Sequence, residues 1–395
     1  MYSYLLIIYI PTIFCFLGNM LKIKKKTLLQ FSFFFLFLVA AFRFEFGADY
    51  TSYYSFYNKF LLKKYEELTF LEIGYRWLNI LISSMKLDFN ILLSVISFVN
   101  LYFFYRFMIF INIKRSFYWI IFFTYISLYN LYFYHLSMIR QSIAIYIFLF
   151  SFQYIYKKEI KKYIIIILLA TLFHKSAIIL LPIYYINRIN FKIKYICLFF
   201  ICSIFFIINV ELFVNLLTKV LELVNMDKYV HYINVTPIKF NTGIGFILNI
   251  CSIFLFSYLL KLKFSKKNKL LIKMILISRL LIFLNIVGIS ILHRVVSYFD
   301  IYTIFIPCII ILSLENKIKK NKLYYILFCS YLFLVFLGYN LLFIQKYNGM
   351  MKAYSSTYYM DYLKRYKIKF LYEDKYKNKI FERDSNTGKI YFIKR

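Results

Sequence analysis

Glycine and proline are scarce in this chain of 395 residues, which contains 9 glycines and 4 prolines. These numbers are too small for glycine-rich phosphate-binding turns or for the many short hairpins of a β-barrel. Charged residues are also few, at 17%, while 62% of the residues are hydrophobic; a soluble domain has about 25% and about 45–50%, respectively. These shortages exclude a soluble enzyme and a disordered chain. They predict an α-helical polytopic membrane protein, since only helices and closed barrels satisfy their backbone polar groups in hydrocarbon.

Motifs for metal and nucleotide chemistry are missing. The chain has no DxD, no EF-type loop, no Walker motif, no GxSxG and no HExxH, the patterns expected of metal-dependent, nucleotide-binding or hydrolytic sites. Its six cysteines lie inside apolar runs, with no CxxC or Cys/His spacing, and such thiols behave as small hydrophobic groups. We therefore expect neither a metal nor another cofactor.

Acidic residues are outnumbered by basic ones, with 17 Asp and Glu against 50 Lys and Arg and a formal net charge of +33. In a soluble chain this excess would indicate nucleic acid. Here most basic residues form short runs between apolar segments, at 22–26, 112–115, 157–162, 261–269 and 315–322. Short cytoplasmic loops carry such runs, so these five predict the cytoplasmic side. The partners expected for this charge are membrane lipids, and no nucleic acid is expected.

Apolar segments of spanning length recur along most of the chain, each close to the roughly 20 residues that a bilayer requires. They cover about residues 2–21, 28–46, 89–111, 117–135, 139–156, 163–186, 193–210, 243–262, 270–289, 291–313 and 322–344. The first has no basic region before it and no A-x-A site, so we interpret it as a retained span. A shorter segment, 72–86, contains Glu72 and Arg76 and is more typical of an interfacial or re-entrant helix.

The basic runs constrain the topology. All five can face the cytoplasm together if segment 72–86 does not cross and segment 163–186 turns back at its centre, where His174 and Lys175 interrupt the apolar sequence. We predict an all-α polytopic integral membrane protein with about ten transmembrane helices plus two short re-entrant or interfacial helices, and with its N-terminus outside.

The chain reads as one membrane domain followed by a tail. Residues 1–344 form the membrane domain, with extracytoplasmic loops at about 47–71 and 211–242. Residues 345–395 form a basic C-terminal tail. With about ten spans and the N-terminus outside, the tail would also lie outside. Its basic residues instead favour the cytoplasm, so both sides stay open.

Ionisable residues near the predicted outer ends of the spans are informative, because each costs about 2.5–3.5 kcal/mol inside hydrocarbon. Arg43, Glu45 and Asp49 end the second span, and Tyr50 and Tyr53 follow them. Tyrosines at this level form either an interfacial belt or a platform that stacks on the apolar face of a sugar.

Two further groups also admit two interpretations. Glu72 and Arg76 are four residues apart with the acid first, the favourable order for an intrahelical ion pair. Alternatively Glu72 serves catalysis or acceptor binding, with Tyr75 beside it on the sugar. Arg140 begins a middle span, where it either snorkels to headgroups or turns inward and binds a planar oxyanion through its fork of donors.

The last ionisable groups lie in the second half of the chain. His174 can relay a proton near neutral pH, and Lys175 can neutralise a phosphate. Arg294 opens a late span together with Asp300. Arg279, in the middle of the preceding span, requires an acidic partner on another helix or a wet cavity.

Four cations are thus expected to converge near the extracytoplasmic face, namely Arg43, Arg140, Lys175 and Arg294. Few acids accompany them, which favours an anionic ligand over simple ion pairing. A lipid-linked diphosphate donor fits, because arginines can stabilise the departing diphosphate in place of a metal.

Five short motifs, in this order and placement, resemble those of a known family. They are RFEFGADY at 43–50, EIGY at 72–75, RQSIA at 140–144, FHKSA at 173–177 and RVVSYF at 294–299. Over about residues 28–340 the chain resembles the EpsG-like branch of the Wzy-type polysaccharide polymerases. The implied counterparts are Arg43, Gly47, Asp49, Tyr50, Glu72, Gly74, Arg140, His174 and Arg294.

The resemblance implies a metal-independent enzyme of the bacterial inner membrane. Such enzymes join oligosaccharide repeat units carried on undecaprenyl diphosphate, at the outer face, into capsule, exopolysaccharide or O-antigen. A chain-length regulator and other assembly proteins are possible partners. The alternatives are an O-antigen ligase-like glycosyl transfer enzyme and a flippase or transporter of lipid-linked oligosaccharide.

The polymerase hypothesis assigns roles to residues. The base that takes the proton from the acceptor hydroxyl would be Asp49, Glu72 or His174. The donor diphosphate would be bound by Arg43, Arg140, Lys175 and Arg294. The sugars would contact Tyr50, Tyr53 and Tyr75.

Overall fold

Helices make up almost all of the part of the chain that the computed structural model describes, which is residues 2–43, 49–128, 131–223, 244–285, 290–318, 379–383 and 390–394. The α-helices are α1 (Tyr2–Met20), α2 (Lys25–Ala41), α3 (Tyr50–Leu61), α4 (Ile73–Ser84), α5 (Phe89–Ile111), α6 (Tyr118–Phe123), α7 (Leu131–Ser137), α8 (Ile139–Lys157), α9 (Ile160–Phe173), α10 (Ile193–Ile208), α11 (Val210–Leu223), α13 (Ile244–Leu259), α14 (Lys266–Leu284), α15 (Ser290–Thr303) and α16 (Ile306–Ile318). Other windings connect them: the 3₁₀-helices η1 (Glu66–Leu68), η2 (Arg115–Phe117) and η4 (Lys175–Arg188), and the π-helix η3 (Thr124–Leu128).

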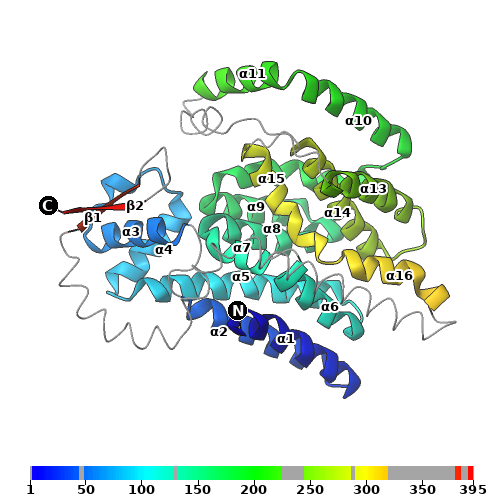
Figure 1. Cartoon of the computed structure of the whole chain (residues 1–395), viewed down its shortest axis with the longest axis horizontal. Coiled ribbons are helices and arrows are strands. Elements are labelled where there is room, and N and C mark those ends of the chain that lie inside the picture. Colours follow the sequence, from blue (N-terminus) through cyan, green and yellow to red (C-terminus); the bar gives the residue numbers. More distant parts are fainter. Residues whose placement is uncertain are drawn as a thin grey trace.

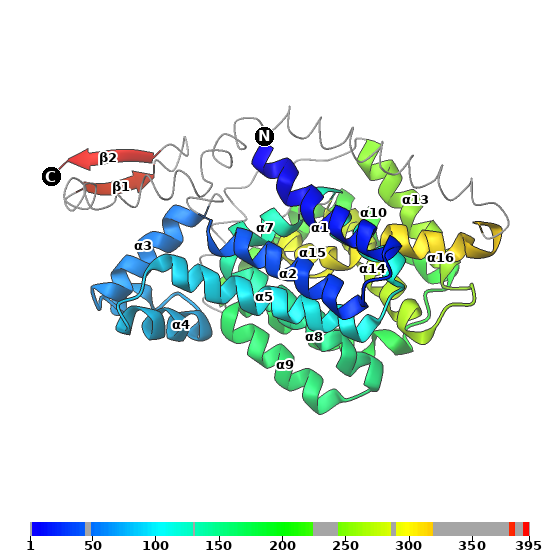
Figure 2. The same ribbon diagram turned by 90° about the horizontal axis from the view of Figure 1, so that it is seen from below.

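Two strands lie in the C-terminal tail. Strands β1 (Lys379–Arg383) and β2 (Ile390–Lys394) pair antiparallel, with Phe381 opposite Phe392. Their isoleucine and aromatic side chains favour the extended conformation. Figure 2 shows this pair apart from the helical body. The prediction of a helical fold is therefore confirmed for the described part of 1–344, and the tail departs from it.

The helical body is built around α5 and α8. Helices α1, α2, α5, α8 and α9 follow one another side by side (Figure 2), while α15 lies against α8 and α14 against α15. Helices α5 and α8 run in the same direction: the ring of Phe103 is 5.0 Å from that of Phe150, and Phe110 is 5.6 Å from Tyr156. The first turn of α8 is therefore at the same end of the body as the first turn of α5.

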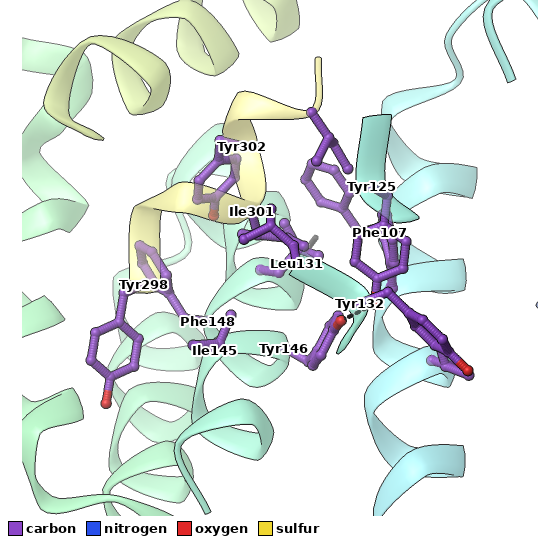
Figure 3. Close-up of a cluster of buried hydrophobic side chains, with 14 of the residues drawn as sticks. Phe107, Tyr125, Leu131, Tyr132, Ile145, Tyr146, Phe148, Tyr298, Ile301 and Tyr302 are labelled. Carbon is purple, nitrogen blue, oxygen red and sulfur yellow. Dashed lines mark hydrogen bonds between the residues drawn. The ribbon is translucent and has the colours of Figure 1, made fainter. Parts of the chain in front are cut away.

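An aromatic cluster fills the space between α5, η3, α7, α8 and α15 (Figure 3). Tyr302 of α15 lies between Phe107 and Phe148, with ring centroids 6.1 and 5.9 Å away and near-perpendicular planes. The hydroxyls of Tyr125 and Tyr146 share a hydrogen bond. Edge-to-face rings add about 0.5–1.5 kcal/mol per pair beyond their burial, so the abundant aromatic residues fix how these helices meet.

The outer faces of several helices are apolar. Side chains more than half exposed include Ile165 of α9, Ile201, Phe205 and Ile208 of α10, and Leu248 of α13. An apolar surface of this kind is stable in contact with hydrocarbon rather than water. The outward chemistry of the helices is that of a membrane protein.

The prediction of about ten spans is not confirmed. In the described residues, only α5 is by itself long and apolar enough to cross a bilayer, and two bent pairs, Ile193–Ile208 with Val210–Leu216 (80°) and Leu292–Thr303 with Ile306–Leu314 (43°), would raise the number to three. The predicted span 117–135 shows why, because it is divided among η2, α6, η3 and α7. The predicted span 322–344 lies outside the described residues.

The predicted basic runs meet at one end of the body. Lys25 donates to Asn112 Oδ1 at 3.0 Å, which joins the runs 22–26 and 112–115. Lys267 donates to the Phe110 carbonyl at 2.6 Å, which brings run 261–269 to the same place. Cations at helix C-termini satisfy the last carbonyls and the helix dipole. These three runs therefore lie at one end, as predicted, whereas residues 319–322 of the run 315–322 lie outside the described residues.

Segment 163–186 turns back at His174, as predicted. Helix α9 ends at Phe173, and His174 has an extended backbone with φ −154° and ψ 111°. Helix η4 then returns along α9: Tyr163 Oη donates to the Leu180 carbonyl at 2.6 Å, and Asn187 Nδ2 donates to the Ile155 carbonyl at 3.1 Å. Both ends of this hairpin thus lie at the basic end, and its tip lies at the opposite end.

Candidate functional site

Three predicted site residues from distant parts of the sequence meet at the end opposite the basic runs. Arg140, in the first turn of α8, donates through Nη1 to Glu72 Oε2. His174, between α9 and η4, places Nδ1 3.3 Å from Glu72 Oε1. Figure 1 shows α4, α8 and α9 in neighbouring positions. We call Glu72, Arg140 and His174 the acid–base cluster.

Glu72 is ionised in this cluster. Burial by itself would raise the pKa of Glu72, but the interaction with His174 and the charge of Arg140 outweigh it and lower the pKa to about 2. A carboxylate with so low a pKa is a poor base at neutral pH. Glu72 is instead suited to hold Arg140 and His174 in position.

The intrahelical ion pair with Arg76, one of the two interpretations of Glu72, is absent from the ion pairs of the described residues. Glu72 precedes α4 and has extended backbone angles, with φ −64° and ψ 144°. Its side chain therefore does not share the helical face that the i, i+4 spacing assumes. Arg140 takes the place predicted for Arg76.

The two ring nitrogens of His174 differ in what they face. The side chain is buried, and among the residues that the structure describes neither Nδ1 nor Nε2 makes a hydrogen bond, while Nδ1 lies 3.3 Å from Glu72 Oε1. A carboxylate facing Nδ1 favours the tautomer with its proton on Nδ1 and a lone pair on Nε2. This arrangement suits an imidazole that accepts a proton from a ligand.

Gly74 allows the cluster to close. A Cβ built on Gly74 would lie 2.9 Å from the Leu172 carbonyl oxygen and 3.0 Å from Leu172 Cβ. Only glycine permits so close an approach of α4 to the last turn of α9. Because Glu72 and His174 flank these two contact points, the approach brings the carboxylate to the imidazole.

Tyrosines surround Arg140. Tyr53 Oη accepts from Arg140 Nε at 3.2 Å, and the guanidinium carbon is 5.7 Å from the centre of the Tyr53 ring. The ring of Tyr75 stands at 70° to that of Tyr53, with 5.7 Å between centroids. Tyr50, Tyr53 and Tyr75 are all buried, and their predicted contact with sugar stays a prediction.

The other predicted residues are more dispersed. Arg43 is buried between α2 and α5, where Nη1 donates to the Ala40 carbonyl at 2.9 Å and to Ser97 Oγ at 2.7 Å. Lys175 is exposed and follows His174 directly. Asp49, exposed before α3, acts electrostatically on Tyr53. Glu45 and Gly47 lie outside the described residues.

Arg294 is tied to the start of α8. Its backbone carbonyl accepts a hydrogen bond of 2.8 Å from Gln141 Nε2, the side chain next to Arg140. On the same helix, Asp300 accepts from Ser278 Oγ at 3.0 Å and lies within electrostatic range of Arg279. The acidic partner predicted for Arg279 is therefore found on another helix.

Two contacts at this end were not predicted. Tyr134 Oη and His293 Nε2 are 3.0 Å apart, and Ser176 Oγ and Tyr298 Oη are also 3.0 Å apart. His293 adjoins Arg294 in the sequence, which is a signal for its place, whereas Tyr134 lies in an aromatic run without a distinguishing feature. Within the described ranges there is no group of three or more His, Cys, Asp or Glu that could hold a metal ion.

These features define a helical membrane protein with a buried acid–base cluster at one end. The chain matches the EpsG family over residues 26–356 and therefore belongs to that family. The predicted family is thus confirmed, and membership indicates a membrane protein of polysaccharide biosynthesis. No curated protein and no solved structure matches the chain.

Proposed function

We propose that this protein is a polymerase that joins undecaprenyl-diphosphate-linked oligosaccharide repeat units on the extracytoplasmic face of the bacterial cytoplasmic membrane. The observation that carries the proposal is the acid–base cluster, in which Glu72, Arg140 and His174 meet within a family of polysaccharide biosynthesis. A glycosyl transfer of this kind needs a base for the acceptor hydroxyl and cations for the leaving diphosphate. Both kinds of group are present at this end.

His174 is the proposed base. Its Nε2 takes the proton of the acceptor hydroxyl as that oxygen attacks the anomeric carbon of the donor. Glu72 holds Nδ1 and stabilises the imidazolium that forms. General-base catalysis of this kind raises the rate about 10²–10⁴-fold. Of the three bases considered from the sequence, His174 is preferred over Glu72 because the pKa of Glu72 is about 2.

Arg294 takes the charge of the leaving group. As the bond from the anomeric carbon to the phosphate oxygen breaks, its electron pair leaves with undecaprenyl diphosphate. Gln141 links the Arg294 backbone to the first turn of α8, next to Arg140, whose own charge is paired with Glu72. Arg294 is therefore the proposed cation for this charge, and Arg140 holds Glu72, the partner of the base. The planar guanidinium binds phosphate oxygens with two parallel hydrogen bonds. Arg43 is held between α2 and α5 and is assigned to the fold instead.

A deletion strain complemented with variants tests the proposal. His174→Ala and Arg140→Ala should insert normally yet abolish the polymer ladder, while a single repeat unit is still made and exported. Arg106→Ala is the matched control, because this exposed arginine of α5 donates to Tyr102 Oη at 2.9 Å and lies away from the acid–base cluster. It should leave the ladder intact.

The glycan profile separates the alternatives. A normal ladder in the His174→Ala strain would exclude the assigned base. Loss of every surface glycan in the deletion strain would favour a ligase or a flippase over a polymerase. A chain-length regulator is the proposed protein partner, and its deletion should change the length distribution without removing the ladder.

A further inference from the structure

A second polar group lies at the same end of the molecule, across the start of α8 from the acid–base cluster. Tyr134 of α7 and His293 of α15 are joined by a contact of 3.0 Å between Oη and Nε2, with ring centroids 6.2 Å apart and planes at 50°. Arg294 follows His293 in the first turns of α15. We call Tyr134, His293 and Arg294 the outer cluster.

The outer cluster is held at a defined distance along α8. Gln141 donates to the Arg294 carbonyl at 2.8 Å, one residue after Arg140 of the acid–base cluster. One turn further along α15, Ser297 Oγ donates to the His293 carbonyl at 2.9 Å, and Ser297 is buried. The two clusters therefore flank the same first turn of α8.

The chemistry of the outer cluster suits an oxyanion. A guanidinium, an imidazole and a phenol lie together, and each can donate hydrogen bonds to phosphate oxygens. The contact with Tyr134 engages Nε2 of His293, which leaves Nδ1 on an exposed side chain. Tyr134 is half-buried and His293 is exposed, so a ligand can reach both side chains.

The charges around Tyr134 come from α15 and from the residue before α3. Arg294 of α15, Asp300 further along α15 and Asp49 before α3 all act on it. Asp300 also accepts from Ser278 of α14 and lies within electrostatic range of Arg279. Asp49 also acts on Tyr53, which contacts Arg140 of the acid–base cluster, so this carboxylate lies close to both clusters.

The acid–base cluster is less suited to a diphosphate. The charge of Arg140 is already balanced by Glu72, and most of this pair is shielded from solvent, with side chains 18% and 7% exposed. A diphosphate would add negative charge beside a carboxylate, which is unfavourable at low dielectric. A reaction between two lipid-linked chains needs two sites, so the diphosphate requires a site other than the acid–base cluster.

We propose that Tyr134, His293 and Arg294 bind the diphosphate of the lipid-linked donor, while the acid–base cluster receives the acceptor hydroxyl. This assignment rests on the polymerase function proposed above. It makes His293 and Arg294 ligands of the leaving group, because both donate to phosphate oxygens, and Tyr134 positions the ring of His293. Binding at this site uses hydrogen bonds only, and no proton is transferred there.

Binding of undecaprenyl diphosphate to the purified full-length protein in nanodiscs tests the proposal without turnover. His293→Gln keeps a donor near Tyr134 and removes Nδ1, and Arg294→Gln removes the cation. Each should weaken binding by about tenfold or more, since each deletes a charge-assisted or direct hydrogen bond. Tyr134→Phe should weaken it less, because it only frees the imidazole ring.

The matched controls are Tyr102→Phe and Arg106→Gln, which alter an exposed Tyr–Arg contact of 2.9 Å on α5. Both should bind undecaprenyl diphosphate like the wild type. A thermal melt of each variant without ligand should match the wild type, so that a folding defect is recognised. Undecaprenyl phosphate and phosphatidylglycerol vesicles distinguish a diphosphate site from a general headgroup site: only undecaprenyl diphosphate should compete effectively.

Three outcomes would overturn the inference. They are unchanged binding in His293→Gln and Arg294→Gln, absence of binding in the wild type, and equal competition by phosphatidylglycerol. Reduced binding of a soluble acceptor oligosaccharide in the same variants, with diphosphate binding intact, would assign the cluster to the acceptor instead. These results leave the polymerase proposal standing, because that proposal depends on the ladder in the His174→Ala strain.

Discussion

Gly74 controls, as a single residue, how closely α4 approaches α9. Replacing it by alanine would put a Cβ 2.9 Å from a backbone carbonyl oxygen that cannot rotate away. We expect Gly74→Ala to displace Glu72 from His174 and to reduce polymer formation strongly, with a loss of stability of about 1–3 kcal/mol from overpacking. Ladder length in vivo and thermal unfolding in detergent measure the two effects.

Gly18 provides the matched control for this prediction. A Cβ at Gly18 would also be too close to its neighbour, at 2.3 Å, but that neighbour is the Cδ2 atom at the flexible end of Leu28. A rotamer change can relieve such a contact. Gly18→Ala should therefore retain the ladder; equal damage from both substitutions would show that α4 and α9 have no special need of a close approach.

The sequence predicted which residues are unusual better than which residues touch. Glu72, Arg140 and His174 stand out because ionisable groups are costly within apolar segments, and the structure brings these three together. The partner of Glu72 was not predictable from spacing, since residue 72 precedes the helix that the spacing assumes. A helix boundary shifted by one residue changes which side chains share a face.

Arg43 and Tyr134 show the limits of composition at this scale. Arg43 was expected among the site cations, yet it is buried against Ser97 of α5. Tyr134 was not expected at all, because an aromatic residue in an aromatic run carries no distinguishing pattern. Its place depends on a contact with His293, which is 159 positions further along the chain. Contacts of such long range follow from helix packing rather than from local sequence.

Lys273 connects two elements that are far apart in the sequence. From α14 it donates to the carbonyls of Ile186, Asn187 and Ile189, at 3.1, 3.0 and 2.8 Å, and so holds the C-terminal end of η4. We expect Lys273→Met to release this end, because hydrogen bonds from a charged donor are worth about 1.5–3 kcal/mol. Hydrogen exchange across 175–188 should become faster, and the ladder should shorten.

Lys267→Met is the control on the same helix. Lys267 donates to the Phe110 carbonyl at the end of α5 and lies 4.2 Å from the centre of the Phe110 ring. Its loss should speed exchange at the end of α5 and leave 175–188 unchanged. If both variants affect 175–188 equally, Lys273 has no specific role in holding η4.

Among the elements, the hairpin at His174 was predictable and its winding was not. A histidine and a lysine in the middle of an apolar segment indicate a turn, because a straight span would bury both in hydrocarbon. The 3₁₀ winding of η4 extends over 14 residues, whereas such helices seldom exceed three or four. Pro182 lies within these residues and disfavours a continuous α-helix, but a proline alone does not predict a 3₁₀ winding of this length.

The whole molecule has two chemically different ends. Basic runs meet at one end through contacts such as Lys25 with Asn112, and the acid–base cluster lies at the other. The positive-inside rule assigns the basic end to the cytoplasm. The number of spans could not be confirmed from helix lengths, because many segments are broken or shorter than a bilayer requires.

Cysteine labelling tests this orientation. In a cysteine-free background, Glu66→Cys lies near η1 at the cluster end and Lys263→Cys lies in a basic run, and both positions are exposed. A membrane-impermeant maleimide should label Glu66→Cys in intact spheroplasts and Lys263→Cys only after permeabilisation. Labelling of Lys263→Cys from outside would reverse the assigned orientation and with it the proposed face of reaction.

The winding of η4 also sets the geometry of the reacting end. At about 2.0 Å per residue its 14 residues reach about 28 Å, whereas the same residues wound as an α-helix would reach about 21 Å. Lys273 anchors the far end, so a change of winding would act at the near end and draw His174 away from Glu72 by more than one α-helical turn. Helix η4 is therefore a spacer of fixed length that keeps the proposed base His174 next to the Glu72 carboxylate.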